Sequence, residues 1–396
     1  MKKKLDLILS VVFTAVITCA ATCYVFLVVL DRDEDPFFHT MSEIQEVIDD
    51  NAIFDFDRSE GEKAAVNGYL SGLDDDYRAY WTKEEYEAQQ SSNAGNFTGI
   101  GVSIQATEPI GDGIFVYRVL GNSPAEKAGI LPGDLIVSLN GRSVVGRNYE
   151  EVYTEMGISE GETMTLTVQR DSGGGELSVK EISVTCQRFV QRYVDWRMIG
   201  SVGFIRIHSF NGNCAKEFED ALNALLKAGA KSFVFDLRNN LGGSLNAVEA
   251  ILDLLIAKGE ELVVLSFKND ELIHYSKNDP KTTAPMTVLI NGESASASEL
   301  MASALRDLNG SRLIGNRSFG KGIGQTTYML SDGSAVKVTS FYYLTAGRNY
   351  YHGVGLAPDD EVSLDERQTK YFYSMSETDD PQLQRALEYL NSLPKQ

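Results

Sequence analysis

The sequence VLINGESASASEL at residues 288–300 shows how the second half of this chain is organised. An apolar, strand-like run leads into a turn of small residues, and a helix-like pattern begins after the turn. A hydroxyl at such a turn stands clear of the sheet, and amides at the helix N-terminus can stabilise a developing oxyanion. Ser296 and Glu299 also have the spacing of a capping box, which is the commoner interpretation of this segment alone. The three serines of the turn therefore do not by themselves identify a nucleophile.

Around this segment, residues 199–365 alternate strand-like and helix-like runs. Such alternation predicts an α/β core, in which loops at the carboxyl ends of the strands form the site. We expect strands at 202–207, 232–237, 262–266 and 286–290, and helices at 215–228, 245–257 and 298–308.

A second segment, DLRNNLGGS at residues 236–244, ends a predicted strand and opens a predicted helix. Its consecutive glycines, Gly242 and Gly243, allow two interpretations. The backbone amides could form an anion-binding nest, or the glycines could simply relieve a tight turn. The segment alone does not decide between them.

A third segment, GNRSFGKG at residues 315–322, resembles two known motifs and fits neither. A phosphate-binding loop requires Ser or Thr after the lysine, and Gly322 stands there instead. Ser318 and Lys321 have a β-lactamase-like spacing, but the companion S-D-N and K-T-G boxes are missing. The alternative role for Lys321 is the usual one for a lysine, a solvated cation on a loop.

The N-terminus predicts a membrane anchor. Lys2–Lys4 precede an uncharged, mainly apolar run at residues 7–30, which would span about 36 Å as a helix. The run continues into the charged stretch 31–35 without a clear signal-peptidase site, so we expect an uncleaved anchor. The positive-inside rule then places the part beyond residue 31 outside the cytoplasm, in a single-pass protein of the cell membrane.

The remaining pattern suggests separable modules. Residues 95–188 read as a β-rich module with strands at 101–104, 113–119, 135–139, 163–168 and 181–184, and helices at 123–129 and 149–156. The predicted division is a cytoplasmic tip and anchor at 1–32, a helical segment at 33–94, the β-rich module at 95–188, the α/β core at 189–365 and a helical tail at 366–396.

Composition excludes some classes of function. The formal net charge of −20 argues against nucleic acid as a partner, because binding to phosphates requires clustered Lys and Arg. The four cysteines and four histidines have no metal-ligand spacing. We predict neither a metal nor another cofactor.

Taken together, the three segments resemble the carboxy-terminal processing, or tail-specific, serine proteases. The pattern of that family joins D-L-R-x-N-x-G-G, S-A-S-A-S-E and F-G-K-G-x-x-Q. The resemblance implies an α/β core of the ClpP/crotonase type preceded by a PDZ domain. It extends over almost the whole chain, through Leu73-Asp74, Tyr77, residues 99–102, residues 353–359 and residues 380–383.

By this resemblance the nucleophile is Ser296 and the general base is Lys321, with Gln325 placed to hold the lysine amine. No histidine lies in a matching motif, so a lysine has to serve as the base. A basic lysine must be neutral, and we expect burial among Phe319 and small residues to lower its pKa.

The resemblance also implies the oxyanion donors. One is the Ala297 amide, and the other belongs to Gly242 or Gly243, between which the sequence does not choose. Leu241 departs from the family, where proline is common, and this concerns the rigidity of the loop rather than the chemistry.

For the PDZ module we expect the backbone of Gly99, Ile100, Gly101 and Val102 to bind the terminal carboxylate of a peptide. The peptide would add as a strand beside residues 102–106. A β-turn in an unrelated barrel is the alternative for this glycine pair alone.

The leading hypothesis is a membrane-anchored endopeptidase that acts on the C-terminal regions of extracytoplasmic proteins. The alternative is a catalytically silent PDZ-bearing scaffold that binds protein C-termini. A β-lactamase-like hydrolase is a third class, which the missing boxes disfavour. The terminal helical segments resemble those through which relatives associate, so we expect a homodimer.

Overall fold

The computed structural model describes residues 18, 36–157, 159–171 and 177–394. The chain divides into two compact units, Met1–Gly72 and Leu73–Gln396. The first unit contains the helices α2 (Pro36–Asn51) and α3 (Arg58–Leu70), neither of which buries a residue. The predicted anchor at 7–30 lies outside the described residues except for Thr18. Within the described ranges, no helix has the length and apolarity needed to cross a bilayer.

The second unit is organised around a six-stranded sheet with the order β10-β11-β12-β15-β16-β19. β10 runs antiparallel to β11, and the other neighbouring strands are parallel. β12 and β15 are buried along their whole length, as expected for parallel strands covered on both faces. The strands are β10 (Val194–Ile199), β11 (Val202–Ile207), β12 (Ser232–Asp236), β15 (Met286–Ile290), β16 (Arg312–Gly315) and β19 (Asp360–Glu361).

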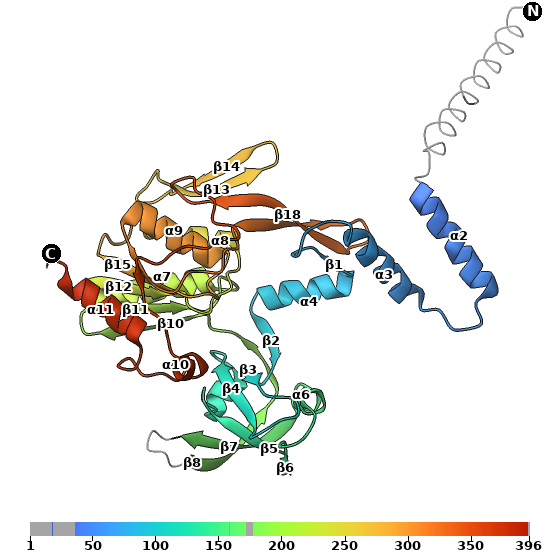
Figure 1. The fold of residues 1–396 in the computed structure, drawn as a ribbon, viewed down its shortest axis with the longest axis horizontal. Helices are drawn as coiled ribbons and strands as arrows, with labels where there is room; N and C mark the ends of the chain where they lie inside the picture. Colours follow the sequence, from blue (N-terminus) through green and yellow to red (C-terminus); the bar gives the residue numbers. More distant parts are fainter. Residues whose placement is uncertain (1–17, 19–35, 158, 172–176, 395–396) are drawn as a thin grey trace, which may run out of the picture. The chain divides into compact units, whose positions relative to one another are not determined.

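Helices cover both faces of this sheet (Figure 1). Phe233 and Phe235 of β12 point into a core shared with α7 (Cys214–Lys227), α8 (Leu245–Leu252) and α9 (Ala297–Asn309). The intervening Val234 packs on the opposite face with Leu383 and its neighbours on α11 (Pro381–Ser392). Alternate residues of one strand thus fill two separate cores, because successive side chains of a strand point to opposite faces.

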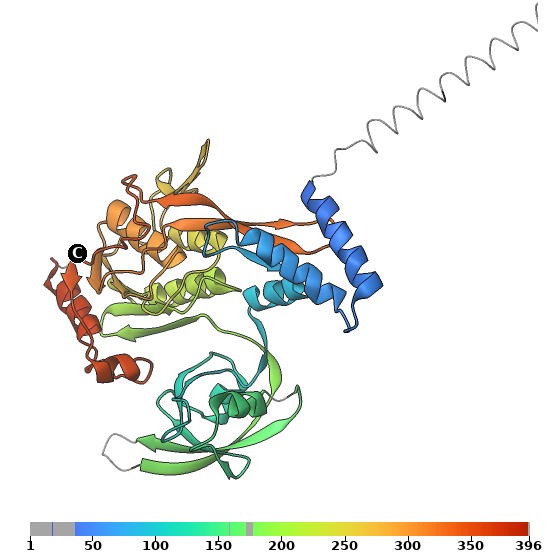
Figure 2. The same ribbon diagram turned by 45° about the vertical axis from the view of Figure 1, so that its right-hand side comes forward.

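A second, antiparallel sheet has the order β1-β18-β13-β14, with β17 also paired to β18. Figure 2 shows the orange hairpin of β17 and β18 extending away from the parallel sheet. The short strand β1 pairs along β18, with Ala79 opposite Lys337 and Trp81 opposite Ala335. The strands are β1 (Ala79–Trp81), β13 (Glu261–Phe267), β14 (Glu271–Tyr275), β17 (Ile323–Met329) and β18 (Ala335–Leu344), and α4 (Lys83–Asn93) follows β1.

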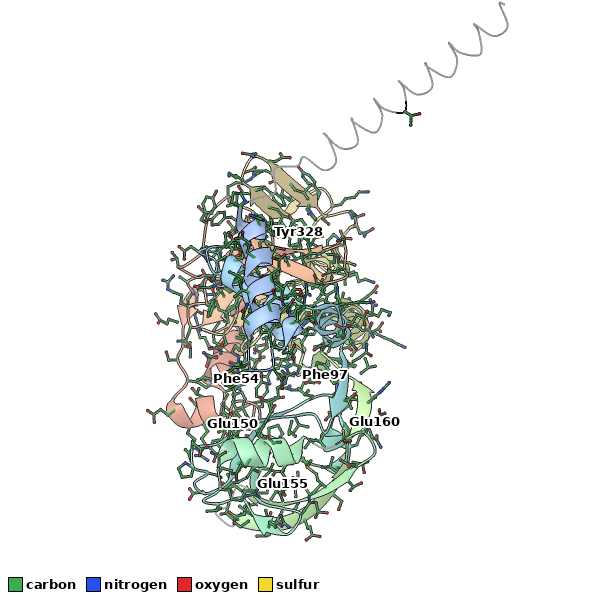
Figure 3. The ribbon with its side chains drawn as sticks, turned by 90° about the vertical axis from the view of Figure 1, so that its right-hand side faces the viewer. Phe54, Phe97, Glu150, Glu155, Glu160 and Tyr328 are labelled. Carbon is green, nitrogen blue, oxygen red and sulfur yellow. The ribbon has the colours of Figure 1, made fainter. Side chains whose placement is uncertain are left out.

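The β-rich module has a sheet of order β3-β4-β5-β7-β8, with β6 paired to β5. A separate ribbon of β2 and β9 joins the module to the flanking chain. The elements are β2 (Asn96–Gly99), β3 (Val102–Gln105), β4 (Ile114–Val119), α5 (Pro124–Ala128), β5 (Leu135–Leu139), β6 (Arg142–Ser143), α6 (Tyr149–Met156), β7 (Thr163–Asp171), β8 (Leu177–Thr185) and β9 (Gln187–Val190), and α10 (Glu366–Lys370) lies near the end of the chain. Figure 3 labels Glu150 and Glu155 on α6, which buries Val152 and Met156 in the core of the module.

Several predicted elements differ from the observed ones. The helix expected at 245–257 ends at Leu252, and the Asp253 carboxylate accepts the backbone amides of Lys277 and Asn278. The segment expected to be helical at 33–94 includes the strand β1, and the division between compact units falls after Gly72. In contrast, the predictions for 202–207, 286–290 and 149–156 coincide with β11, β15 and α6.

Candidate active site

Ser296 occupies a strained turn between β15 and α9. Its backbone has φ 56° and ψ −115°, whereas residues at the N-cap of a helix are usually extended. A positive φ is uncommon in serine, and such strain costs about 1–3 kcal/mol when the surrounding structure imposes it. Strained strand-to-helix turns hold the nucleophile of α/β hydrolases clear of the sheet. The expected capping box of Ser296 and Glu299 is therefore present, but the backbone at Ser296 is not that of an ordinary helix cap.

The two neighbouring serines have structural partners. Ser294 is buried, and its hydroxyl donates to the carbonyl oxygen of Leu237 at 2.9 Å. Ser298 is also buried and donates to the carbonyl oxygen of Asn240 at 2.7 Å. Both hydroxyls thus hold the loop of residues 237–243, which we call the glycine loop, against the turn. Ser296 remains the candidate nucleophile.

The glycine loop approaches the serine turn closely at Gly242. A Cβ atom at this glycine would lie 2.9 Å from Ser296 Cβ and 3.0 Å from the Ala297 nitrogen. The Gly242 amide already donates to Asn240 Oδ1 at 2.9 Å. The residues that the structure describes provide no acceptor for the Gly243 amide. Of the two glycines that the sequence left open, Gly243 is therefore the better candidate for an oxyanion donor alongside Ala297.

A buried arginine anchors the start of the glycine loop. Arg238 donates to Asp236 at 2.9 and 2.8 Å and to Asp380 at 3.0 and 2.7 Å. A further bond from Arg238 reaches Gln382 at 2.8 Å. Burial acts to lower the pKa of Arg238, but the two carboxylates outweigh it and hold the pKa above its ordinary value. The network joins the end of β12 to the beginning of α11.

Glu299 connects the serine turn to the segment that contains Lys321. Its Oε2 atom accepts the Ser296 amide at 3.0 Å and the Lys321 amide at 2.8 Å. Its Oε1 atom accepts the Gly320 amide at 2.7 Å and the Ser318 hydroxyl at 2.5 Å. Burial raises the pKa of Glu299, although these four hydrogen bonds act in the opposite direction. Two segments that the sequence matched to separate motifs therefore share one buried carboxylate.

The surroundings of Lys321 lower the pKa of its amine, although the contact with the Tyr77 ring favours the charged form. The side chain is half-buried, and Nζ lies 4.1 Å from the centroid of the Tyr77 ring. Burial lowers the pKa of Lys321, the charge of Lys337 acts in the same direction, and Asp75 opposes both. The expected burial against Phe319 is wrong, because that side chain is 53% exposed. The aromatic contact comes from Tyr77 instead.

Gln325 lies on β17, where its Nε2 donates to Thr339 Oγ1 of β18 at 3.1 Å. Asp75 in turn accepts the Thr339 hydroxyl at 2.9 Å. Sequence reasoning missed Asp75, Thr339 and the bridging role of Glu299. The capping-box spacing identified Glu299 only as a partner of Ser296, and Asp75 lies between the Leu73-Asp74 and Tyr77 matches to the family pattern.

The predicted peptide-binding residues lie in the β-rich module, where Gly99 ends β2, Ile100 and Gly101 form the link and Val102 begins β3. Gly101 has φ +80°, and a Cβ there would lie 2.3 Å from Ser123 Cβ, so only glycine fits. The Ile100 carbonyl accepts the Ala125 amide at 2.8 Å, which ties this link to α5. β3 is the edge strand of its sheet and starts at Val102. An edge strand next to such a turn is where an extended peptide can add.

Comparisons with known proteins match two segments of the chain to known families. Residues 201–362 match peptidase family S41, and residues 115–170 match the PDZ domain. The chain is 34% identical over 364 residues to a "Probable CtpA-like serine protease" of Staphylococcus aureus strain N315, which covers 91% of this chain and 71% of that protein. A protein of the same description from Staphylococcus saprophyticus is 32% identical over 361 residues, or 90% of this chain and 72% of that one.

Solved structures show the same fold. The photosystem II D1 C-terminal processing protease has a TM-score of 0.52 at 26% identity, over 81% of this chain and 86% of that one. A "Putative S41 protease" from Bacteroides fragilis NCTC 9343 has a TM-score of 0.65 at 16% identity, over 87% and 93% of the two chains. The strained serine turn and the fold define the class, which is that of the serine hydrolases. Within that class, the chain belongs to peptidase family S41 and is a serine protease of the C-terminal processing type with a PDZ domain.

Within the described ranges, no group of three His, Cys, Asp or Glu side chains could hold a metal ion.

Proposed function

We propose that this protease hydrolyses peptide bonds with Ser296 as the nucleophile and Lys321 as the general base. The observation that carries the proposal is the shared carboxylate of Glu299, whose Oε2 accepts the amides of both residues. Its hydrogen bonds hold the strained serine turn next to the lysine segment. The pKa of Lys321 is lowered from its ordinary value by burial, and this supports the assignment because only the neutral amine can accept the serine proton.

The reaction would follow the usual course of acyl transfer. Ser296 Oγ attacks the peptide carbonyl carbon while its proton moves to Lys321 Nζ, and the amides of Ala297 and Gly243 stabilise the oxyanion. The peptide C–N bond then breaks, and Lys321 returns the proton to the leaving amine. In the second half, water attacks the acyl carbon while Lys321 takes its proton, and Lys321 then gives that proton to Ser296 Oγ as the ester C–O bond breaks. Gln325 holds the lysine amine in both halves.

Substrates would be proteins or peptides whose C-terminus binds the PDZ domain. The backbone of Gly99, Ile100, Gly101 and Val102 would hold the terminal carboxylate, and the peptide would extend along the edge strand β3. The apolar run at residues 7–30 would anchor the protease in the cell membrane, with its catalytic part outside the cytoplasm. This last part rests on sequence alone.

The test uses the full chain, purified in detergent, and an unstructured protein as the substrate. We expect Ser296→Ala and Lys321→Ala each to lower cleavage at least about a thousandfold, since members of a catalytic unit act together. Ser303→Ala is the matched control, because Ser303 is also buried in α9 and its hydroxyl donates within that helix, to the Leu300 carbonyl oxygen at 3.2 Å. It should cleave at nearly the unmodified rate.

A fluorophosphonate probe provides a second readout, since it traps a nucleophilic serine covalently. Labelling that disappears in Ser296→Ala identifies the nucleophile without any choice of substrate. Cleavage that survives in either active-site variant would refute the dyad. If no form cleaves or takes up the probe, the PDZ-bearing scaffold becomes the better explanation.

A further inference from the structure

The carboxylate of Asp75 holds two segments of the active site that are distant in the sequence. Its Oδ1 atom accepts the Thr339 hydroxyl at 2.9 Å and the Tyr77 amide at 2.9 Å, and its Oδ2 atom accepts the Thr339 amide at 2.7 Å. Burial acts to raise the pKa of Asp75, but these hydrogen bonds outweigh it and bring the pKa below its ordinary value. The group is therefore an ionised carboxylate that can only accept hydrogen bonds.

The direction of the hydrogen bonds determines how Gln325 is oriented. Because Asp75 can only accept, the Thr339 hydroxyl must donate to it. The oxygen of that hydroxyl is then left as an acceptor, and Gln325 must present its Nε2 group at 3.1 Å. This fixes the side-chain amide in one of its two flipped states, with the carbonyl oxygen Oε1 on the other arm. An oxygen in that position can accept a hydrogen bond from a lysine amine, which an NH₂ group could not do.

The same carboxylate controls the aromatic neighbour of the base. By accepting the Tyr77 amide it fixes the short turn that carries the ring, whose centroid lies 4.1 Å from Lys321 Nζ. The strand β1 continues this segment and pairs Ala79 with Lys337, so the turn is held against β18 on both sides of Tyr77. Asp75 thus fixes the turn of the Tyr77 ring, which contacts Lys321, as well as the orientation of the Gln325 amide.

We propose that Asp75 is a positioning residue, which sets the orientation of the Gln325 amide through Thr339 and thereby directs the amine of Lys321 toward Ser296. The inference rests on the proposed role of Lys321 as the general base. It extends the active site to the segment that begins at Leu73, which lies outside the three motifs of the catalytic core.

A double-mutant cycle on the full chain tests the relay. Asp75→Asn and Thr339→Val should each lower kcat about ten- to a hundredfold with little change in KM, because they misdirect the base without touching the substrate. Thr339→Ser keeps the hydroxyl and should restore most of the activity. In a Gln325→Ala background, Asp75→Asn should lower kcat by a clearly smaller factor than in the unmodified chain, because the part of its effect that passes through the amide is already lost.

Asp332→Asn is the matched control. Asp332 also accepts a backbone amide and a hydroxyl, both from Ser334 at 2.9 and 2.7 Å, but it lies in the turn between β17 and β18. It should leave kcat unchanged. Equal losses from Asp75→Asn with and without Gln325 would show a merely structural role and overturn the relay, as would full activity in Thr339→Val. Either result leaves the dyad intact as long as Ser296→Ala and Lys321→Ala are inactive, so the two proposals fail separately.

Discussion

The contact between the glycine loop and the serine turn predicts that Gly242→Ala abolishes activity. The added Cβ would lie 2.8 Å from the Ala295 carbonyl oxygen, 2.9 Å from Ser296 Cβ and 3.0 Å from the Ala297 nitrogen. Two of these neighbours are backbone atoms and the third is a Cβ atom, so no side-chain rotation can relieve the contacts. Overpacking of this kind costs about 1–3 kcal/mol, and the positive φ of +104° adds about 1–2 kcal/mol for a residue with a side chain.

The larger effect should be on catalysis. Relief of the clash must move Ser296 or Ala297, and loss of one oxyanion donor typically lowers kcat by about 10² to 10³. The assay compares kcat on an unstructured protein substrate and the rate of fluorophosphonate labelling at Ser296. The free energy of unfolding, measured in urea, separates the catalytic loss from a loss of folded protein.

Gly229→Ala is the matched control for backbone strain. Gly229 has φ +90°, and no atom lies within 4 Å of a Cβ placed there. It should lose about 1–2 kcal/mol of stability and keep its activity. If Gly242→Ala retained more than about a third of the unmodified kcat, an oxyanion site built from this loop and turn would be untenable.

Two further predictions concern charges. Arg238→Met should lower the free energy of unfolding by about 3–5 kcal/mol in urea titrations, because it leaves the buried Asp380 without its arginine and the buried Asp236 with Arg206 alone. The exposed Arg348→Met, which also loses two carboxylate partners, should change the free energy of unfolding little. Similar losses in both variants would contradict the role assigned to burial. Lys337→Met removes a charge that lowers the pKa of Lys321, so that pKa rises and the increase of kcat/KM with pH should shift to higher pH. An unchanged pH profile would argue against Lys321 as the titrating base.

The fold could be predicted from the sequence because its signals are local. The apolar runs that became β11 and β15 are continuous and short, and the turn residues around them are small or glycine. The strand β1 could not be predicted, because three residues have too little periodicity and their pairing partner lies on β18, far along the chain. The same holds for the end of α8, where the side chain of Asp253 bonds to residues that follow β14.

The active site, like the fold, could be predicted only in part from the sequence. The order of the motifs and the candidate residues Ser296 and Lys321 were predicted from sequence, through the family resemblance rather than through any single segment. The structural partner of Ser294 is the Leu237 carbonyl oxygen of the glycine loop, and the packing of the sheet brings these two segments together. The Gly242 amide is occupied by the Asn240 side chain of the same loop, a choice of rotamer that leaves no trace in local periodicity.

The sequence by itself therefore indicated an α/β core and a β-rich module, the strand-to-helix turn that contains Ser296 and the absence of histidine from the matching motifs. Only the tertiary structure decided how these parts are held in register. Glu299 joins the serine turn to Lys321, and Asp75 bonds to Thr339 across 264 positions of the chain. A carboxylate satisfies its acceptor sites with whichever donors the fold brings near, and those donors are set by three-dimensional proximity rather than by spacing along the sequence.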